Sequence, residues 1–310
     1  MLIANAPCSW GTLEFEGNQA QRIGYAQMLD ELVETGYTGT ELGDWGFMPT
    51  EPSKLQQELQ RRQLDLLGSW ASVAFKQRKA HAEGEKRVLE IARLLAQAAQ
   101  VNRSDHAPLI VLGDDNGSDP VRTQNAGRVT PEMMMNAQEW DTFVRGVERI
   151  ARAVREQTGL RTVFHPHCAG FVETPPEVEL FLTRTDPELV GIAFDTGHCA
   201  YASGCSDPQA VLDGLKRLGS RLWYVHFKDC QPDVASQARA QGWDYFQALE
   251  AGVFCELGRG CVDFPAVLRQ LQARDYQGWI VVEQDVLPGM GAPKESALRN
   301  RKFLNSIGLT

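Results

Sequence analysis

The sequence predicts a single α/β domain, a (β/α)8 TIM barrel, over residues 1–310. Short apolar runs alternate with amphipathic stretches eight times, which is the order of elements in a barrel of parallel strands. The repeating units average roughly 39 residues, which leaves room for long loops. No linker, low-complexity tract or composition shift indicates a second domain.

Eight short apolar runs are the predicted strands. Their length and their bounding turn residues are typical of strands buried on both faces of a parallel sheet. They are Leu2–Ala6, Gly39–Leu42, Asp65–Gly68, Pro108–Leu112, Thr162–His165, Gly191–Asp195, Leu222–Phe227 and Trp279–Glu283.

The stretches between these runs carry apolar residues three and four positions apart, as one face of a helix requires. Thr174 and Asp207, each followed by proline, are expected to begin helices, and Gly36 and Gly159 to end them. The predicted helices are Ile23–Leu32, Lys54–Leu59, Val88–Ala98, Trp140–Val154, Pro176–Leu182, Pro208–Leu218, Phe264–Leu271 and Ala297–Ile307.

Two polar or extended segments interrupt this alternation, near residues 113–130 and 230–260. Both follow a predicted strand, so in a barrel they lie on the C-terminal face, where active-site loops are found. The cluster Trp243-Asp244-Tyr245-Phe246 within the second segment is apolar enough to dock on another surface. A doubly wound open sheet is the alternative fold, but no glycine-rich phosphate loop follows the first strand.

Composition narrows the functional classes. The formal net charge of −9 disfavours a nucleic-acid partner, because such proteins usually carry a basic surface. No run approaches the roughly 18 apolar residues of a membrane span, and the N-terminus lacks signal-peptide features. We therefore expect a cytoplasmic protein with no membrane contact. Seven cysteines without a CxxC pair favour partly buried thiols over a zinc ribbon or a disulfide scaffold.

The fifth to eighth predicted strands end in side chains that can bind a metal: His165, Asp195, His226 and Glu283. Barrel strands direct their terminal side chains toward a common axis, so such ligands converge without a local motif. One such residue alone is more often a satisfied core histidine or a loop-capping aspartate. Four in succession predict a divalent metal centre, because unpaired buried carboxylates are costly. These ligands leave Mn, Co, Zn, Fe and Mg open.

Several motifs together resemble the xylose isomerase-like TIM-barrel superfamily, which includes sugar-phosphate isomerases and epimerases, inosose dehydratases, dehydroshikimate dehydratases and endonuclease IV. The resemblance covers nearly the whole chain. Its motifs are Ala6–Trp10 (APCSW), Gly36–Leu42 (GYTGTEL), Ala193–His198 (AFDTGH), Val225–Asp229 (VHFKD), Leu257–Gly260 (LGRG) with Asp263–Phe264, and a last strand that closes on Glu283.

This resemblance implies four metal ligands from four strand ends, of which the last three correspond to Asp195, His226 and Glu283. The first is usually a glutamate in a pattern like L-E-P-H, whereas this chain has His165 in that place. Family epimerases and ketose isomerases use two glutamates as bases on opposite faces of the substrate. That pair of carboxylates is absent here.

The histidine-rich end of the fifth strand is similar to the inosose dehydratase branch, whose pattern is close to Y-H-H-H-M-G-T. The segments Val172–Thr174 (VET), His226–Asp229 (HFKD) and Asn136–Trp140 (NAQEW) also resemble that branch, although Pro166 interrupts the histidines. The resemblance implies a lyase that dehydrates a small polyhydroxylated carbonyl compound, a cyclic polyol ketone such as 2-keto-myo-inositol. A metal-stabilised enediolate would form after loss of the proton α to the ketone.

Candidates for proton transfer in such a reaction are Lys228, His198, His167 and Glu41. Lys228 would act as a base only if burial and the metal lowered its pKa. Trp10 and Trp70 are candidates to pack on the substrate ring, with a role as barrel-rim aromatics about equally expected. Arg259 is a further candidate substrate-binding residue, from the LGRG motif.

Three other functions remain in view. A keto-sugar isomerase or epimerase shares the fold, the metal and the enediolate. A DNA-repair nuclease shares the turns Asp195/His198 and His226/Asp229, but it usually needs a three-metal site and a basic groove. A sugar-binding barrel without catalysis would make the metal residues incidental. The oligomeric state, including a homo-oligomer, is not decided by these patterns.

Overall fold

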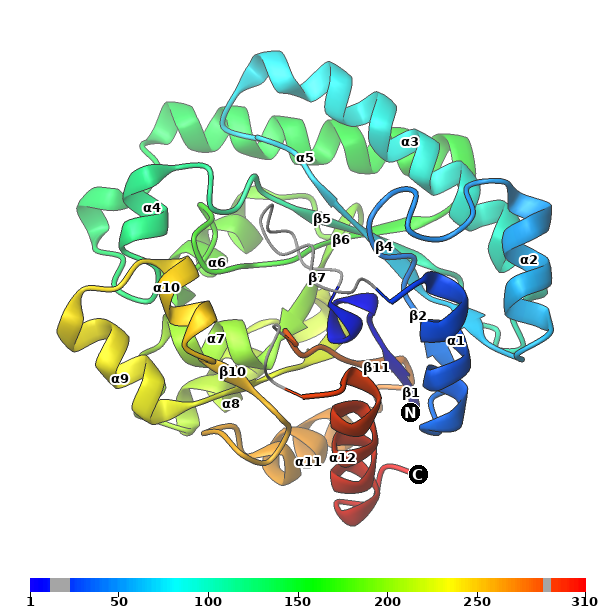
Figure 1. Cartoon of the computed structure of the whole chain (residues 1–310). Coiled ribbons are helices and arrows are strands. Elements are labelled where there is room, and N and C mark those ends of the chain that lie inside the picture. The colour runs from blue at the N-terminus through cyan, green and yellow to red at the C-terminus, as the bar shows by residue number, and fades with distance from the viewer. Residues whose placement is uncertain (12–22, 287–290) are drawn as a thin grey trace.

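The computed structural model, which describes residues 1–11, 23–286 and 291–310, is a barrel of parallel strands surrounded by helices (Figure 1). Each of the eight predicted strands is found at its expected place, within two residues at either end, except that the strand predicted over Asp65–Gly68 continues to Ser72. The strands are β1 (Leu2–Asn5), β2 (Gly39–Thr40), β3 (Asp65–Leu66), β4 (Gly68–Ser72), β5 (Leu109–Gly113), β6 (Arg161–Phe164), β7 (Val190–Asp195), β8 (Leu222–Phe227), β9 (Asp229–Cys230), β10 (Phe254–Cys255) and β11 (Trp279–Val282).

The main sheet closes on itself. Its order is β3-β2-β1-β11-β8-β7-β6-β5-β4, and only Leu67 separates β3 from β4 at the two ends. β3 and β4 are therefore two halves of one strand, the first paired with β2 and the second with β5. Eight strands thus form a closed barrel, which confirms the predicted fold over the doubly wound alternative.

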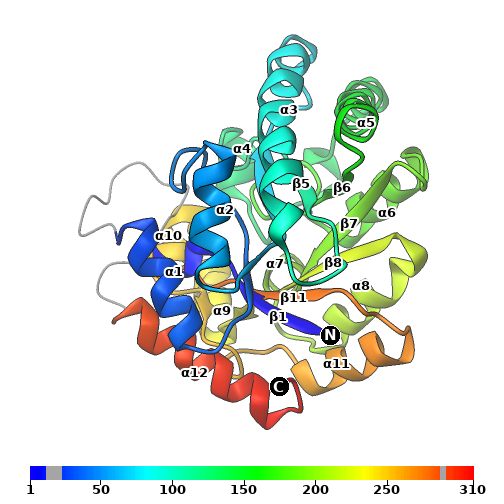
Figure 2. The same cartoon turned by 90° about the vertical axis from the view of Figure 1, so that its right-hand side faces the viewer.

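Helices cover the outside of the barrel on all sides, and the two termini lie close together in both views (Figure 2). All eight predicted helices are confirmed, and four more, α4, α7, α9 and α10, are added in the loops. None of the helices in the described residues is long and apolar enough to cross a bilayer. The helices are α1 (Tyr25–Glu34), α2 (Pro52–Gln60), α3 (His81–Ala98), α4 (Pro120–Gln124), α5 (Ala137–Thr158), α6 (Pro175–Arg184), α7 (Thr196–Ala202), α8 (Gln209–Arg217), α9 (Pro232–Gln241), α10 (Tyr245–Glu250), α11 (Phe264–Ala273) and α12 (Pro293–Ser306).

Two apolar cores stabilise this arrangement. One lies between the strands and the helices, and the other fills the barrel. The barrel core is made of small and large side chains from successive strands: Ala4, Ala6, Leu67, Val111, Val163, Ala193, Tyr224, Trp279 and Val281. Because side chains alternate along a strand, the residue two positions after an inward-facing one also faces inward. The side chain that follows the last barrel-core residue by two positions therefore points into the C-terminal mouth of the barrel.

The segment 113–130 is fixed to the loop after β6 by a buried arginine. Arg122, which is 0% exposed, donates two hydrogen bonds to Glu177, of 2.8 and 2.9 Å, and a third to the Gly170 carbonyl. Glu173 lies 3.9 Å from the same guanidinium and accepts hydrogen bonds from the Gly127 and Ala169 amides. Burial nevertheless raises the pKa of Glu173 to about 7. The network holds the backbone that follows His165 and His167, the two histidines just after β6.

The segment 230–260 folds into β9, α9, α10 and β10 and rests on segment 113–130. Arg128 donates hydrogen bonds to the carbonyls of Ala238 and Trp243, at 3.1 and 2.9 Å. The ring of Phe246 packs so closely on Gly117 that a Cβ there would lie 2.7 Å from it. The expected docking of the Trp243–Phe246 cluster is confirmed, with the other long loop as its partner.

Replacement of Arg122 by methionine should lower the free energy of unfolding by about 3–5 kcal/mol, because it leaves the buried Glu177 carboxylate without a counter-charge. Urea unfolding followed by circular dichroism measures this loss. Arg149→Met is the matched control, since Arg149 pairs with Glu85 at the surface with its side chain 52% exposed. We expect a change below about 1 kcal/mol there. Equal losses in the two variants would contradict the role given to Arg122.

Candidate active site

The four predicted metal ligands meet at the C-terminal mouth of the barrel. One ligand atom from each of His165, Asp195, His226 and Glu283 lies within 4.8 Å of the others. All four follow from strand alternation, because each stands two positions after a barrel-core residue: Val163, Ala193, Tyr224 and Val281. Three of them are almost fully buried, and Glu283 is slightly more exposed.

These side chains present lone pairs that have no hydrogen-bond partner in the described part of the chain, as a cation site requires. His165 Nδ1, Asp195 Oδ2 and His226 Nδ1 are buried and have no hydrogen-bond partner among the described residues. His226 Nδ1 lies 3.2 Å from Glu283 Oε1, without the alignment of a hydrogen bond. His165 faces Asp195 through Nε2, which lies 3.9 Å from Oδ2. Buried polar atoms are rarely left unpaired, so Asp195 Oδ2 and His226 Nδ1, which converge with His165 and the Glu283 carboxylate, indicate a ligand that they share. A divalent metal meets that requirement.

Asp195 also shapes the helix that follows it. It is the N-cap of α7 and accepts a 2.7 Å hydrogen bond from the His198 amide through Oδ1, which leaves Oδ2 for a metal. Burial raises the pKa of Asp195 to about 7, because the charged form loses hydration there. A bound cation would favour the charged form instead.

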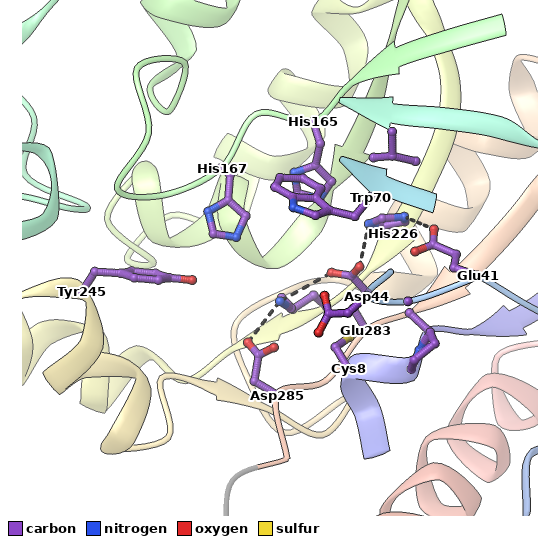
Figure 3. Close-up of a pocket in the computed structure, with 15 residues that line it drawn as sticks. Cys8, Glu41, Asp44, Trp70, His165, His167, His226, Tyr245, Glu283 and Asp285 are labelled. Atoms are coloured by element: carbon purple, nitrogen blue, oxygen red, sulfur yellow. Dashed lines mark hydrogen bonds and ion pairs between the residues drawn. The ribbon is translucent and has the colours of Figure 1, made fainter. Parts of the chain in front are cut away.

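Glu41, at the end of the second barrel strand, orients His226. Its Oε1 lies 3.0 Å from His226 Nε2, so the proton on Nε2 is held and Nδ1 faces the other ligands (Figure 3). Burial disfavours the imidazolium, but the charges of Glu283 and Glu41 outweigh it and raise the pKa of His226 well above its usual value. Carboxylates in this position fix the tautomer of metal-binding histidines and increase their basicity.

Lys228 lies beside the ligands and is held by two carboxylates. Its Nζ is 3.1 Å from Asp285 Oδ2 and 3.5 Å from Glu283 Oε2. Burial favours the neutral amine, but the carboxylates outweigh it and raise the pKa of Lys228 well above its usual value. The two carboxylates therefore favour the ammonium form of Lys228, and the lowered pKa that a base would need is not found. The stem of Lys228 passes over Gly197, where a Cβ would lie 2.6 Å from its Cγ.

His167 and His198 stack with ring centroids 3.8 Å apart. His167 Nδ1 lies 2.7 Å from the Cys168 carbonyl, which can only accept, so Nδ1 carries the proton and Nε2 is left as the basic atom. Burial and the nearby Lys228 lower the pKa of His167 to about 4, so the ring is neutral near pH 7. His198 Nε2 lies 3.5 Å from Lys228 Nζ. His167 and Lys228 line the pocket, whereas His198 is not part of its described lining.

The pocket over the metal ligands contains most of the residues expected from the sequence. Its lining includes Ala6, Pro7, Cys8, Glu41, Gly43, Asp44, Trp70, Val111, His165, His167, His226, Lys228, Tyr245, Glu283 and Asp285. Two of these have a signal that could have been used: Cys8 continues the inward phase of Ala4 and Ala6, and Asp285 continues that of Glu283. Asp44 comes from a loop and Tyr245 from the start of α10 inside the long segment 230–260, where no strand periodicity places a side chain.

Two expected substrate contacts lie elsewhere. Trp10 is buried in the core outside the barrel and donates a 2.9 Å hydrogen bond to Glu31. Arg259 is exposed and is not part of the described pocket lining. Trp10 is the last residue of the 3-10 turn Pro7–Trp10, which takes the chain out of the strand alternation. Arg259 lies in a loop that is held through the backbone amides of Gly258 and Gly260. We therefore do not assign either residue to the pocket.

That loop is held by Asp229, which explains the VHFKD and LGRG motifs together. Its carboxylate accepts hydrogen bonds from the amides of Cys230, Gly258, Gly260 and Val262, at 2.8 to 3.1 Å. A Cβ at Gly260 would lie 2.3 Å from the carboxylate. Asp229 is thus a structural anchor, although a nuclease of this fold would be expected to use it as a metal ligand.

The chain belongs to the xylose isomerase-like TIM barrel family, whose model matches residues 29–307. Among curated proteins it is 32% identical to the inosose dehydratase of Bacillus velezensis, over 97% of this chain and 94% of that protein. It is also 32% identical to the inosose dehydratase of Halalkalibacterium halodurans, over 92% and 88% of the two chains.

Solved structures with the same fold are more distant in sequence. The probable 3-DHS dehydratase AsbF of Bacillus anthracis superposes with a TM-score of 0.67 at 15% identity, over 98% of this chain and 99% of that one. The IOLI protein, described with a binding zinc atom, gives a TM-score of 0.69 at 14% identity, over 99% and 98%. At this identity the likeness concerns the fold alone.

The Glu41→Gln variant should bind Mn²⁺ about 10–100-fold more weakly than the wild type, because an amide polarises His226 less than a carboxylate does. Electron paramagnetic resonance of free Mn²⁺ during titration measures the affinity. Glu31→Gln serves as the control, since Glu31 bonds Trp10 outside the pocket. An unchanged affinity in Glu41→Gln would show that Glu41 does not support the metal site.

Proposed function

We propose that this protein is a divalent-metal-dependent dehydratase that removes water from a cyclic polyol ketone such as 2-keto-myo-inositol. The observation that carries the proposal is that His167 and Lys228 line one pocket over the candidate metal ligands, the first with Nδ1 bound to the Cys168 carbonyl and the second held by Asp285 and Glu283. One can accept a proton and the other can donate one, as a dehydration requires. Full-length relatives named inosose dehydratase support the substrate class.

The metal would be held by His165, Asp195, His226 and Glu283. Two imidazoles and two carboxylates suit Mn, Co, Fe or Zn better than Mg, which prefers oxygen ligands. When bound, the metal supplies Lewis-acid polarisation of the substrate carbonyl. Glu41 keeps His226 in the tautomer that this task needs.

His167 is the proposed base. Its Nδ1–H is committed to the Cys168 carbonyl, so only Nε2 can take the proton from the carbon next to the ketone. The fixed tautomer presents this lone pair without rearrangement, although the lowered pKa makes it a weak base. The polarised carbonyl makes that proton more acidic and so reduces the basicity required.

Lys228 is the proposed acid. Asp285 and Glu283 keep it protonated, and its ammonium can donate a proton to the departing hydroxyl, so that water leaves rather than hydroxide. His198 lies within 3.5 Å of Lys228 and behind His167, so it supports both groups as a neighbour rather than as a substrate contact.

The substrate ring would lie between Trp70 and Tyr245. The indole of Trp70 packs edge-on against His165, with centroids 5.4 Å apart, and Tyr245 approaches His167 from α10 at 5.8 Å (Figure 3). Trp70 can reach this place because Gly113 has no side chain, since a Cβ there would lie 1.9 Å from the indole. Aromatic side chains beside the polar side chains of the candidate metal site suit a ring whose C–H groups and hydroxyls differ in polarity.

Incubation of the protein with 2-keto-myo-inositol and Mn²⁺ or Co²⁺ should produce the absorbance of a conjugated enol-dione. Chelator treatment should abolish the activity, and added metal should restore it. Mass spectrometry of the substrate in D2O distinguishes the alternative: proton exchange without loss of water would favour an epimerase and overturn the proposed reaction.

Gly113→Ala should lower kcat/KM for this substrate by about 100-fold, because the added methyl group displaces Trp70 by an ångström or more. Gly24→Ala is the matched control, since no atom of the described residues lies within 4 Å of a Cβ at Gly24. Steady-state kinetics measures both, and equal kcat/KM in the two variants would exclude a positioning role for Trp70.

A further inference from the structure

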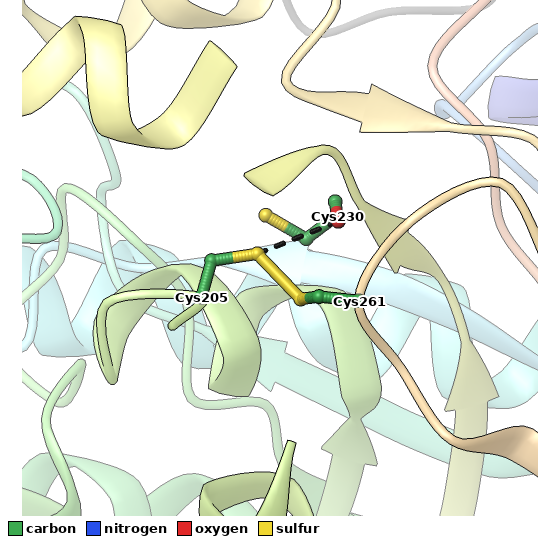
Figure 4. Close-up of side chains that lie close together, drawn as sticks. All are labelled: Cys205, Cys230 and Cys261. Atoms are coloured by element: carbon green, nitrogen blue, oxygen red, sulfur yellow. Dashed lines mark hydrogen bonds between the residues drawn. A yellow bond between two sulfur atoms is a disulfide. The ribbon is translucent and has the colours of Figure 1, made fainter. Parts of the chain in front are cut away.

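Three cysteines from separate segments meet on one side of the barrel, away from the substrate pocket. Cys205 follows α7, Cys230 is the second residue of β9, and Cys261 lies in the loop after β10 (Figure 4). Their sulfur atoms all lie within 4.8 Å of one another. In this structure Cys205 and Cys261 form a disulfide, and Cys230 remains a thiol beside it.

A disulfide alone does not account for the cluster, because it uses two of the three sulfur atoms. Cys205 and Cys230 are buried, and Cys261 is partly exposed. Cys205 has a positive φ of 53°, an uncommon backbone conformation for a residue other than glycine. The turn is held by the Cys205 amide, which donates a 2.8 Å hydrogen bond to the Ala200 carbonyl. The fold thus keeps this sulfur turned toward the other two.

We propose that Cys205, Cys230 and Cys261 form a second metal site, which binds a thiophilic divalent ion such as Zn²⁺ or Cd²⁺ when the disulfide is reduced. Three thiolates select soft or borderline ions, whereas the His/Asp/Glu centre also accepts harder ones. Reduction by a phosphine breaks the Cys205–Cys261 bond, yields two thiols, and gives the phosphine oxide with its oxygen from water. Each of the three thiols then releases its proton when the ion binds.

The position of the site gives it a bracing role. Cys205 continues α7, which begins at the metal ligand Asp195, and Cys230 follows Lys228 and Asp229. Cys261 belongs to the loop whose amides Asp229 holds. An ion bound by all three would fasten the end of α7 to both ends of the segment 230–260. The partly exposed Cys261 provides an entry route and room for water as a fourth ligand.

Titration of phosphine-reduced protein with Cd²⁺ tests the proposal. Sulfur-to-cadmium charge transfer gives an ultraviolet absorption band that the His/Asp/Glu centre cannot produce. We expect a band that saturates at one thiolate-bound ion per chain. Cys230→Ser and Cys261→Ser should each weaken this binding by about 100-fold or more in competition with a chelator. Cys255→Ser, on neighbouring β10 and outside the trio, is the matched control and should bind as the wild type does.

Circular dichroism identifies any variant that fails to fold, and the partly exposed Cys261 offers the milder change if Cys230→Ser does so. Mn²⁺ affinity should be the same in all folded variants, which separates this site from the catalytic centre. Absence of the band in reduced wild-type protein would overturn the proposal. So would a band of undiminished affinity in either Cys230→Ser or Cys261→Ser.

Discussion

The alternation of side chains along strands that close into a ring is the constraint on which the site depends. In a closed barrel every second side chain of each strand points inward. A side chain two positions after a barrel-core residue therefore points toward the barrel axis at the C-terminal end. Val163, Ala193, Tyr224 and Val281 fix that phase in four strands. A shift of one residue in the register of any of these strands would turn its candidate metal-binding side chain outward. The outward-facing residues of that strand would then point into the barrel.

The charges gathered at this mouth are balanced through Glu283. One of its oxygens lies beside His226 and the other beside Lys228, so a single carboxylate interacts with both the His226 imidazole and the Lys228 ammonium. Each of these two groups also has a second carboxylate partner: Glu41 for His226 and Asp285 for Lys228. A cation bound at Glu283 would weaken its attraction for Lys228 and lower the pKa of the ammonium. Proton donation would then become easier only when the metal is present.

The sequence was sufficient for the fold and for the convergence of four ligand side chains, because both follow from periodicity and strand order. It was not sufficient where a side chain's direction depends on a turn. Trp10 leaves the inward phase of β1 through a 3-10 turn, and Tyr245 reaches the pocket from a helix in a long loop. The Arg122–Glu177 pair and the cysteine cluster each join segments that are far apart in the chain. A single sequence does not show which of its distant residues come into contact.

The segment 230–260 begins and ends at one place, since β9 and β10 pair antiparallel, with Phe254 opposite Cys230. Asp229 fixes the return of the chain to the barrel through the amides of Gly258, Gly260 and Val262, which lie outside α9 and α10. The segment is therefore a module whose length and residues can change in evolution while the strands that carry the ligands keep their register. Because Tyr245 belongs to this module, exchange of one insertion would change the lining of the pocket while the four side chains at the strand ends keep their places.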